Sequence, residues 1–108
     1  MIKDKNYVIK PDQIEDVPIG DAFTMLMNDC GMIDSCILPE DKLTVRRQTE
    51  AGVGDIIVAV HDDHFLVRRI GIVNGNFYLV PDNDGYIPVK KSDTVTVGRV
   101  IGMERDLR

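Results

Sequence analysis

The fold class is decided by Gly54-Asp-Ile-Ile-Val-Ala-Val60, followed by His61-Asp-Asp-His-Phe-Leu-Val-Arg-Arg-Ile70 and Gly71-Ile-Val-Asn-Gly-Asn-Phe-Tyr-Leu-Val80. The first part is a continuous run of mostly β-branched apolar residues, typical of a strand covered on both faces. Asp62-Asp63 predicts a tight turn. Asn74-Gly75 predicts a type I′ hairpin turn, because both central residues of that turn need a positive φ. We therefore expect strands joined by two hairpins at the centre of an antiparallel sheet.

Further strands are predicted on either side of this centre. Residues 23–27 and 43–45 are short apolar strands, and Thr94–Met103 is a longer last strand in which Gly98 and Gly102 indicate bulges or bends. Strands at a spacing of roughly ten residues predict a mainly β protein, an antiparallel, partly open barrel or sandwich. We expect one β domain over residues 22–108, preceded by an N-terminal arm over residues 1–21 that is extended or turning.

Composition excludes several classes of function. The 13 basic and 18 acidic residues give a net charge of −5, which argues against direct nucleic-acid binding by this chain. No apolar run has the length of a membrane span and no signal-peptide pattern is present, so we expect a cytoplasmic protein that does not enter a membrane. Cys30, Cys36, His61 and His64 lack zinc-site spacing. We therefore expect no metal or other cofactor, and two reduced thiols.

Three blocks of the chain, in order, carry a further pattern. The first is Met27–Val45, with Met32, Ile37, Asp41 and Val45 as its matching residues; the second is Gly54–Ile70; the third is Leu79–Val89, with Pro81, Asn83, Tyr86 and Pro88. Together with Val95–Glu104 they resemble the β-rich domain of the LexA/UmuD-type self-cleaving serine peptidases over about residues 22–104. The resemblance implies the antiparallel β fold of the LexA C-terminal domain.

That resemblance also implies a Ser–Lys dyad, in which a serine hydroxyl attacks a backbone carbonyl and a neutral lysine takes its proton. The residue at the serine position, directly before Met32, is Gly31, and the residue at the lysine position is Arg68. Glycine offers no nucleophile, and a guanidinium with a pKa above about 12 cannot act as a general base. We interpret the chain as a degenerate, catalytically inactive member. If Arg68 is buried it needs a carboxylate, for which Asp29 and Asp34 are both candidates.

Alternatives of other classes remain open at this point. The chain could be a self-processing or Cys30-dependent peptidase, since Cys30 adjoins the vacant position, although a base is missing. It could instead bind a peptide strand in the vestigial cleft without cutting it. Ser35 is expected to cap or solvate a turn, and His64 to be solvated at a hairpin tip. The arginine pairs at 46–47 and 68–69 are expected at solvated strand edges, apart from Arg68, rather than in a phosphate site.

The leading hypothesis is a dimerisation or protein-interaction module. The resemblance implies pairing of two copies through the last strand, and an unpaired apolar edge strand would be a liability in a monomer. We therefore expect a homodimer whose interface contains Val95, Val97, Val100, Ile101 and Met103. The setting implied by the resemblance is the SOS response to DNA damage or the transcription regulation of a mobile element, with a protein or peptide as a further partner.

Overall fold

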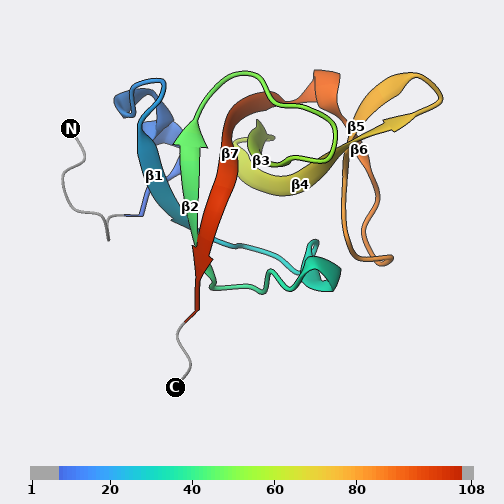
Figure 1. Ribbon diagram of the computed structural model, residues 1–108, viewed down its shortest axis with the longest axis horizontal. Coiled ribbons are helices and arrows are strands. Elements are labelled where there is room, and N and C mark those ends of the chain that lie inside the picture. Colours follow the sequence, from blue (N-terminus) through green and yellow to red (C-terminus); the bar gives the residue numbers. More distant parts are fainter. Residues whose placement is uncertain (1–7, 106–108) are drawn as a thin grey trace.

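The computed structural model describes residues 8–105, which form one seven-stranded sheet with strand order β1-β2-β7-β3-β4-β5-β6 (Figure 1). All neighbouring strands in this order are antiparallel. The strands are β1 (Ala22–Leu26), β2 (Lys42–Arg47), β3 (Ile56–His61), β4 (His64–Val73), β5 (Asn76–Val80), β6 (Val89–Lys90) and β7 (Val95–Glu104). Three short 3-10 helices accompany them: η1 (Pro11–Asp16), η2 (Ile33–Ser35) and η3 (Lys91–Asp93). The predicted mainly β, antiparallel fold is confirmed.

Both predicted hairpin turns are present. Asp62 and Asp63 have φ values of 50° and 65°, and Asn74 and Gly75 have φ values of 51° and 82°. The first turn sets His61 opposite His64, and the second sets Val73 opposite Asn76. Because a two-residue loop fixes the register of the strands it joins, these turns align β3, β4 and β5.

The last strand, β7, lies inside the sheet between β2 and β3 (Figure 1). Its register shifts by one residue twice, so that Val97 is skipped in the pairing with β3 and Ile101 in the pairing with β2. The predicted irregularities at Gly98 and Gly102 are thus confirmed as bulges. The expectation that this strand is an edge holds only in part, because β3 pairs with β7 no further than Arg99. From Val100 to Glu104, β7 has β2 on one side and no described strand on the other.

Apolar side chains form two clusters on opposite faces of the sheet. Alternation along β3 places Val58 in the larger cluster and its neighbours Ile57 and Ala59 in the smaller one. The smaller cluster also contains Ile70 and Leu79. The larger one contains Ile9, Ile14, Val17, Phe23, Met25, Met27, Met32, Ile37, Leu43, Val45, Phe65, Val67 and Val97.

Three members of the larger cluster, Ile9, Ile14 and Val17, come from the segment predicted as an N-terminal arm. This segment also adds a backbone hydrogen bond from the Ile9 N–H to the Thr24 carbonyl of β1. Residues 8–21 therefore pack into the same core as the strands, while residues 1–7 of the predicted arm lie outside the described residues. No helix within residues 8–105 is long and apolar enough to cross a membrane.

We predict that Gly98→Ala destabilises the protein. A Cβ at residue 98 would lie 2.5 Å from the Arg46 carbonyl oxygen and 2.6 Å from Val45 Cγ1, so β2 and β7 would have to separate locally. The expected loss in the free energy of unfolding is about 1–3 kcal/mol, measured by urea denaturation.

The control is Gly102→Ala, at the second bulge of the same strand. Its Cβ would meet Thr44 Cβ at 3.6 Å, an ordinary van der Waals distance. We expect a change within about 0.5 kcal/mol. Equal losses in the two variants would contradict the argument from close approach.

Candidate functional site

The Arg68 guanidinium fills the space beside Gly31. A Cβ built on Gly31 would lie 2.4 Å from Arg68 Cζ and 2.4 Å from its Nη1. Arg68 is only 3% exposed, although it carries a charge. The structure therefore brings together the two residues, 37 positions apart in sequence, that stand where a serine and a lysine were expected (68 − 31 = 37).

Several groups hold the guanidinium in place. Nη1 and Nη2 donate to the two carboxylate oxygens of Asp29 at 3.1 and 3.0 Å, and Nη1 also donates to the Val67 carbonyl at 2.7 Å. The ring of Tyr86 lies over the group, with its centroid 5.2 Å from Cζ. Of the two expected partners of Arg68, the structure shows Asp29. The bidentate ion pair and the cation–π contact are what allow a charge to be buried here.

The loop that carries Gly31 also forms hydrogen bonds with residues 82–86. The Tyr86 hydroxyl accepts a hydrogen bond from the Cys30 N–H at 3.2 Å, and Asn83 Nδ2 donates to the Cys30 carbonyl at 2.8 Å. The Asp82 N–H donates to the Gly31 carbonyl at 2.8 Å. In Figure 1 the segment with η2 and the loop between β5 and β6 reach the same end of the molecule. Asn83 and Tyr86, two matching residues of the third sequence block, thus fix the backbone beside the filled space.

A second polar cluster was missed by the sequence reasoning. The Ser35 hydroxyl donates to Asp82 Oδ2, and Arg69 Nη2 reaches the same carboxylate oxygen at 3.0 Å and Ser35 Oγ at 3.1 Å. Burial acts to raise the pKa of Asp82, but the hydrogen bonds from Ser35 and Arg69 outweigh it and lower that pKa. Such a carboxylate is a poor general base for the Ser35 hydroxyl. The cluster joins η2 to β4 and to the β5–β6 loop.

Asp41 anchors the end of β7 to the loop that precedes β2. Arg105 Nε and Nη2 donate to its two carboxylate oxygens, both at 2.8 Å, and the Leu38 N–H donates to Oδ2 at 2.8 Å. The hydrogen bond from Arg105 lowers the pKa of this carboxyl, against the opposing effect of burial. The same contact raises the pKa of Arg105. Asp41 is therefore a structural carboxylate, held ionised by its partner.

The remaining sequence candidates lie as follows. Cys30 is half-buried and Cys36 is exposed, and both are free thiols. His64 is exposed at the β3–β4 turn, as predicted. Within residues 8–105 no group of three or more His, Cys, Asp or Glu side chains is placed to hold a metal ion.

The paired arginines bind groups of the chain itself. Arg46 Nη1 donates to the Gly20 carbonyl and Arg47 Nη1 to the Val97 carbonyl, each at 3.2 Å. Arg68 and Arg69 are bound to carboxylates, as described above. These contacts do not gather the four guanidinium groups into one anion-binding surface. They stabilise loops and strand ends.

Comparison with known proteins shows what the chain is similar to. The family described as Peptidase S24-like matches residues 3–101. The LexA repressor of Pelotomaculum thermopropionicum is 35% identical over 88 residues, 82% of this chain and 43% of that protein. The LexA repressor of Leuconostoc citreum is 38% identical over 88 residues, 81% and 42% of the two chains. That of Staphylococcus haemolyticus is 34% identical over 104 residues, 95% and 50%. The chain thus matches half or less of the length of these relatives.

We predict that Gly31 and Arg68 are energetically coupled. Gly31→Ala would force the guanidinium away from Asp29 and the Val67 carbonyl, with an expected loss of about 1–3 kcal/mol in unfolding free energy. In an Arg68→Ala background the same change should cost at least about 1 kcal/mol less, because the space is empty. Urea denaturation of the four proteins of this double-mutant cycle measures the coupling.

The control for this cycle is Gly52→Ala. The nearest atom to its added Cβ would be an Asp55 carboxylate oxygen at 3.9 Å. Its effect should be small and the same in both backgrounds. Additive losses for Gly31→Ala and Arg68→Ala would show that the two positions do not compete for one space.

Proposed function

This chain belongs to the Peptidase S24-like family, and we propose that it is a member without peptidase activity that acts as a homodimeric protein-interaction module. The observation that carries the proposal is the Arg68 guanidinium lying in the space beside Gly31. The proposed setting is the cytoplasm, in the SOS response or in the transcription regulation of a mobile element. The similarity to LexA repressors supports that setting.

The case for inactivity is chemical. Acyl transfer by a Ser–Lys dyad needs a hydroxyl to attack and a neutral amine to take its proton. Gly31 offers no side chain, and Arg68 remains a cation paired with Asp29. The space that a serine side chain at residue 31 would occupy is filled by the guanidinium, which is held there by Asp29 and by the ring of Tyr86. Glycine at position 31 and arginine at position 68 are compatible with each other, because the arginine side chain occupies the space that a serine would need.

We predict that the purified chain keeps a constant intact mass during prolonged incubation at alkaline pH, as followed by mass spectrometry. It should also leave a reporter peptide of mixed sequence uncut. The double variant Gly31→Ser with Arg68→Lys restores both groups of the dyad, and it should gain cleavage of that peptide if the groove is otherwise retained. Gly31→Ser alone is the control, and it should stay inactive because Arg68 still fills the space.

Self-cleavage or peptide cleavage by the unmodified chain would contradict this proposal. If Cys30→Ala removed that activity while Cys36→Ala kept it, the Cys30-dependent peptidase would replace this proposal. If activity persisted in Cys30→Ala, another nucleophile would have to be sought.

The proposed dimer uses the open part of β7. Beyond Arg99 one side of this strand is free of described partners, so a second copy could pair antiparallel with Val100–Glu104 and continue the sheet. Ile101 and Met103 are exposed there, and Val100 is partly exposed. Val97 is only 2% exposed and belongs to the larger apolar cluster. Val95 is exposed at the opposite end of the strand, where β7 pairs with β3.

We predict that Ile101→Lys with Met103→Lys converts a dimer to a monomer, because two ammonium groups would face their copies across the two-fold axis. Light scattering coupled to gel filtration gives the mass of each species. The control is Ile87→Lys with Val53→Lys, which adds the same charge at exposed apolar positions outside β7 and should leave the dimer intact. A monomeric unmodified chain at high concentration would be incompatible with the proposed interface.

A further inference from the structure

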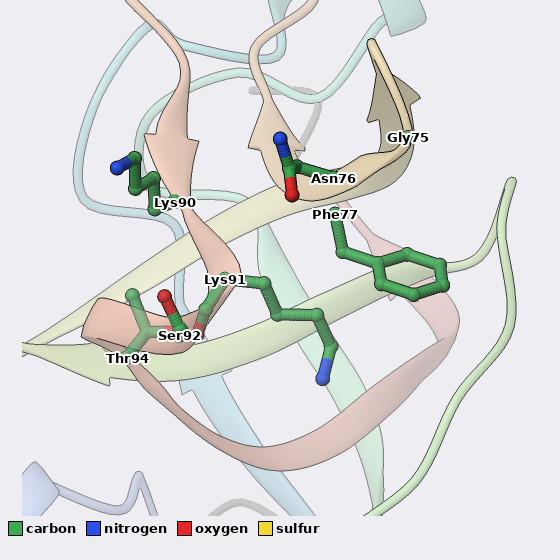
Figure 2. Close-up of a pocket in the computed structure, with 7 residues that line it drawn as sticks. All are labelled: Gly75, Asn76, Phe77, Lys90, Lys91, Ser92 and Thr94. Atoms are coloured by element: carbon green, nitrogen blue, oxygen red, sulfur yellow. Dashed lines mark hydrogen bonds between the residues drawn. The ribbon is translucent and has the colours of Figure 1, made fainter.

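A pocket of about 570 Å³ lies beside β5 and η3 (Figure 2). Asn76 and Phe77 of β5 line it together with Lys90, Lys91, Ser92 and Thr94. The pocket exists because β6 is short. This strand pairs with β5 only at Tyr78 and Leu79, and the chain then turns into η3. The Thr94 hydroxyl donates to the Lys91 carbonyl at 2.8 Å and so stabilises this turn. The volume is within the range of roughly 300–1,000 Å³ found for ligand sites.

The charge of this pocket is opposite to that of the whole chain. The chain carries a net charge of −5, yet the lining contains two lysines and no carboxylate. Neither lysine ammonium forms an ion pair with a carboxylate among residues 8–105. Figure 2 shows Lys90 and Lys91 extending in different directions, with the Phe77 ring projecting from β5. Because Lys90 pairs with Tyr78, its side chain lies on the sheet face opposite that of Phe77. Lys91 is therefore the cation that the pocket presents beside the Phe77 ring, with the hydroxyls of Ser92 and Thr94 in the same lining.

An exposed apolar strip adjoins the pocket. Phe77 is 53% exposed, and its cross-strand partner Ile72 is 54% exposed. Both residues lie on the same sheet face as the buried pair Ile70 and Leu79, because side chains alternate along a strand. The apolar face of the smaller cluster thus continues, uncovered by any described segment, toward the tip of the β4–β5 hairpin. Such a continuation beside a charged pocket suits a ligand that has both apolar and anionic groups.

We propose that this surface docks an acidic, extended segment of another protein, with a carboxylate at Lys91 and an apolar side chain on Phe77 and Ile72. A nucleic acid fits less well, because its regularly spaced phosphates need many cations and the lining contains only two lysines. The lining contains neither Gly31 nor Arg68 and no residue of the open part of β7. The inference therefore holds whether or not the chain cleaves peptides or dimerises.

The test uses the full chain and a fluorescein-labelled hexapeptide, Asp-Glu-Leu-Phe-Asp-Glu, in a fluorescence anisotropy titration at low salt. We expect saturable binding that weakens with added salt and is lost when the peptide's acids are replaced by their amides. Lys91→Glu should weaken binding at least about fivefold, because it turns an attraction into a repulsion. Phe77→Ser should also weaken binding, through loss of the apolar contact.

The matched control is Lys10→Glu. It makes the same change in charge at an exposed lysine just before η1, near the opposite edge of the sheet. It should leave affinity within about twofold of the unmodified chain, well below the effect expected of a pocket charge. If Lys10→Glu and Lys91→Glu weakened peptide affinity equally, the proposed site would be contradicted, because affinity would then depend only on net charge.

Two further outcomes overturn the proposal. One is the absence of saturation at about 1 mM peptide, the weak limit for a specific contact. The other is tighter binding of a twelve-nucleotide oligo-dT that Lys91→Glu and Phe77→Ser abolish, which would assign the pocket to single-stranded nucleic acid. Light scattering on Lys91→Glu should give the mass of the unmodified chain. If the unmodified chain were monomeric but still bound the peptide, only the proposed homodimer would be contradicted.

Discussion

A buried guanidinium needs a carboxylate, and much of the structure around Gly31 follows from how the Arg68–Asp29 ion pair meets that need. The pair is bidentate, lies under the ring of Tyr86 and leaves no room for a side chain at residue 31. Asp29 also accepts a hydrogen bond from the Gly31 N–H at 2.8 Å, so the same carboxylate orders the loop and neutralises the cation. Removing either partner would leave a charge or an unsatisfied loop in the interior, which is why Gly31, Asp29, Arg68 and Tyr86 are best understood as one unit.

The second constraint is the central place of β7. Lying between β2 and β3, this strand joins the β1–β2 side of the sheet to the β3–β6 side, and one bulge interrupts its pairing with each neighbour. Gly98 permits the close approach to β2, and the Asp41–Arg105 pair secures the strand's end. Because β3 stops short of Val100, the same strand is central over one half and open over the other. A strand of this kind can hold a core together and still offer an edge to a second copy.

Much of the local structure was predictable, because it depends on residues close together in the chain. The two positive-φ turns, the strands they join and the irregularities at Gly98 and Gly102 are all present. The choice of Asp29 over Asp34 was not predictable, since both are near Gly31 in sequence and only the path of the loop separates them. The Ser35–Asp82–Arg69 cluster was missed for a similar reason: Ser35 and Asp82 are 47 residues apart, and no local pattern joins them. Nor did the weak apolar pattern of residues 8–21 reveal that Ile9, Ile14 and Val17 are core residues.

The sequence by itself determined the β character, the hairpin registers and the residue types at positions 31 and 68, because φ preferences, side-chain alternation and the presence of a hydroxyl or an amine belong to individual residues. Only the tertiary structure decided that Arg68 turns toward Gly31, that β7 runs through the middle of the sheet, and that Lys90 and Lys91 share a pocket with Phe77. Those outcomes depend on which distant segments meet. These long-range contacts are determined by the burial of apolar faces and the pairing of buried charges over the whole chain.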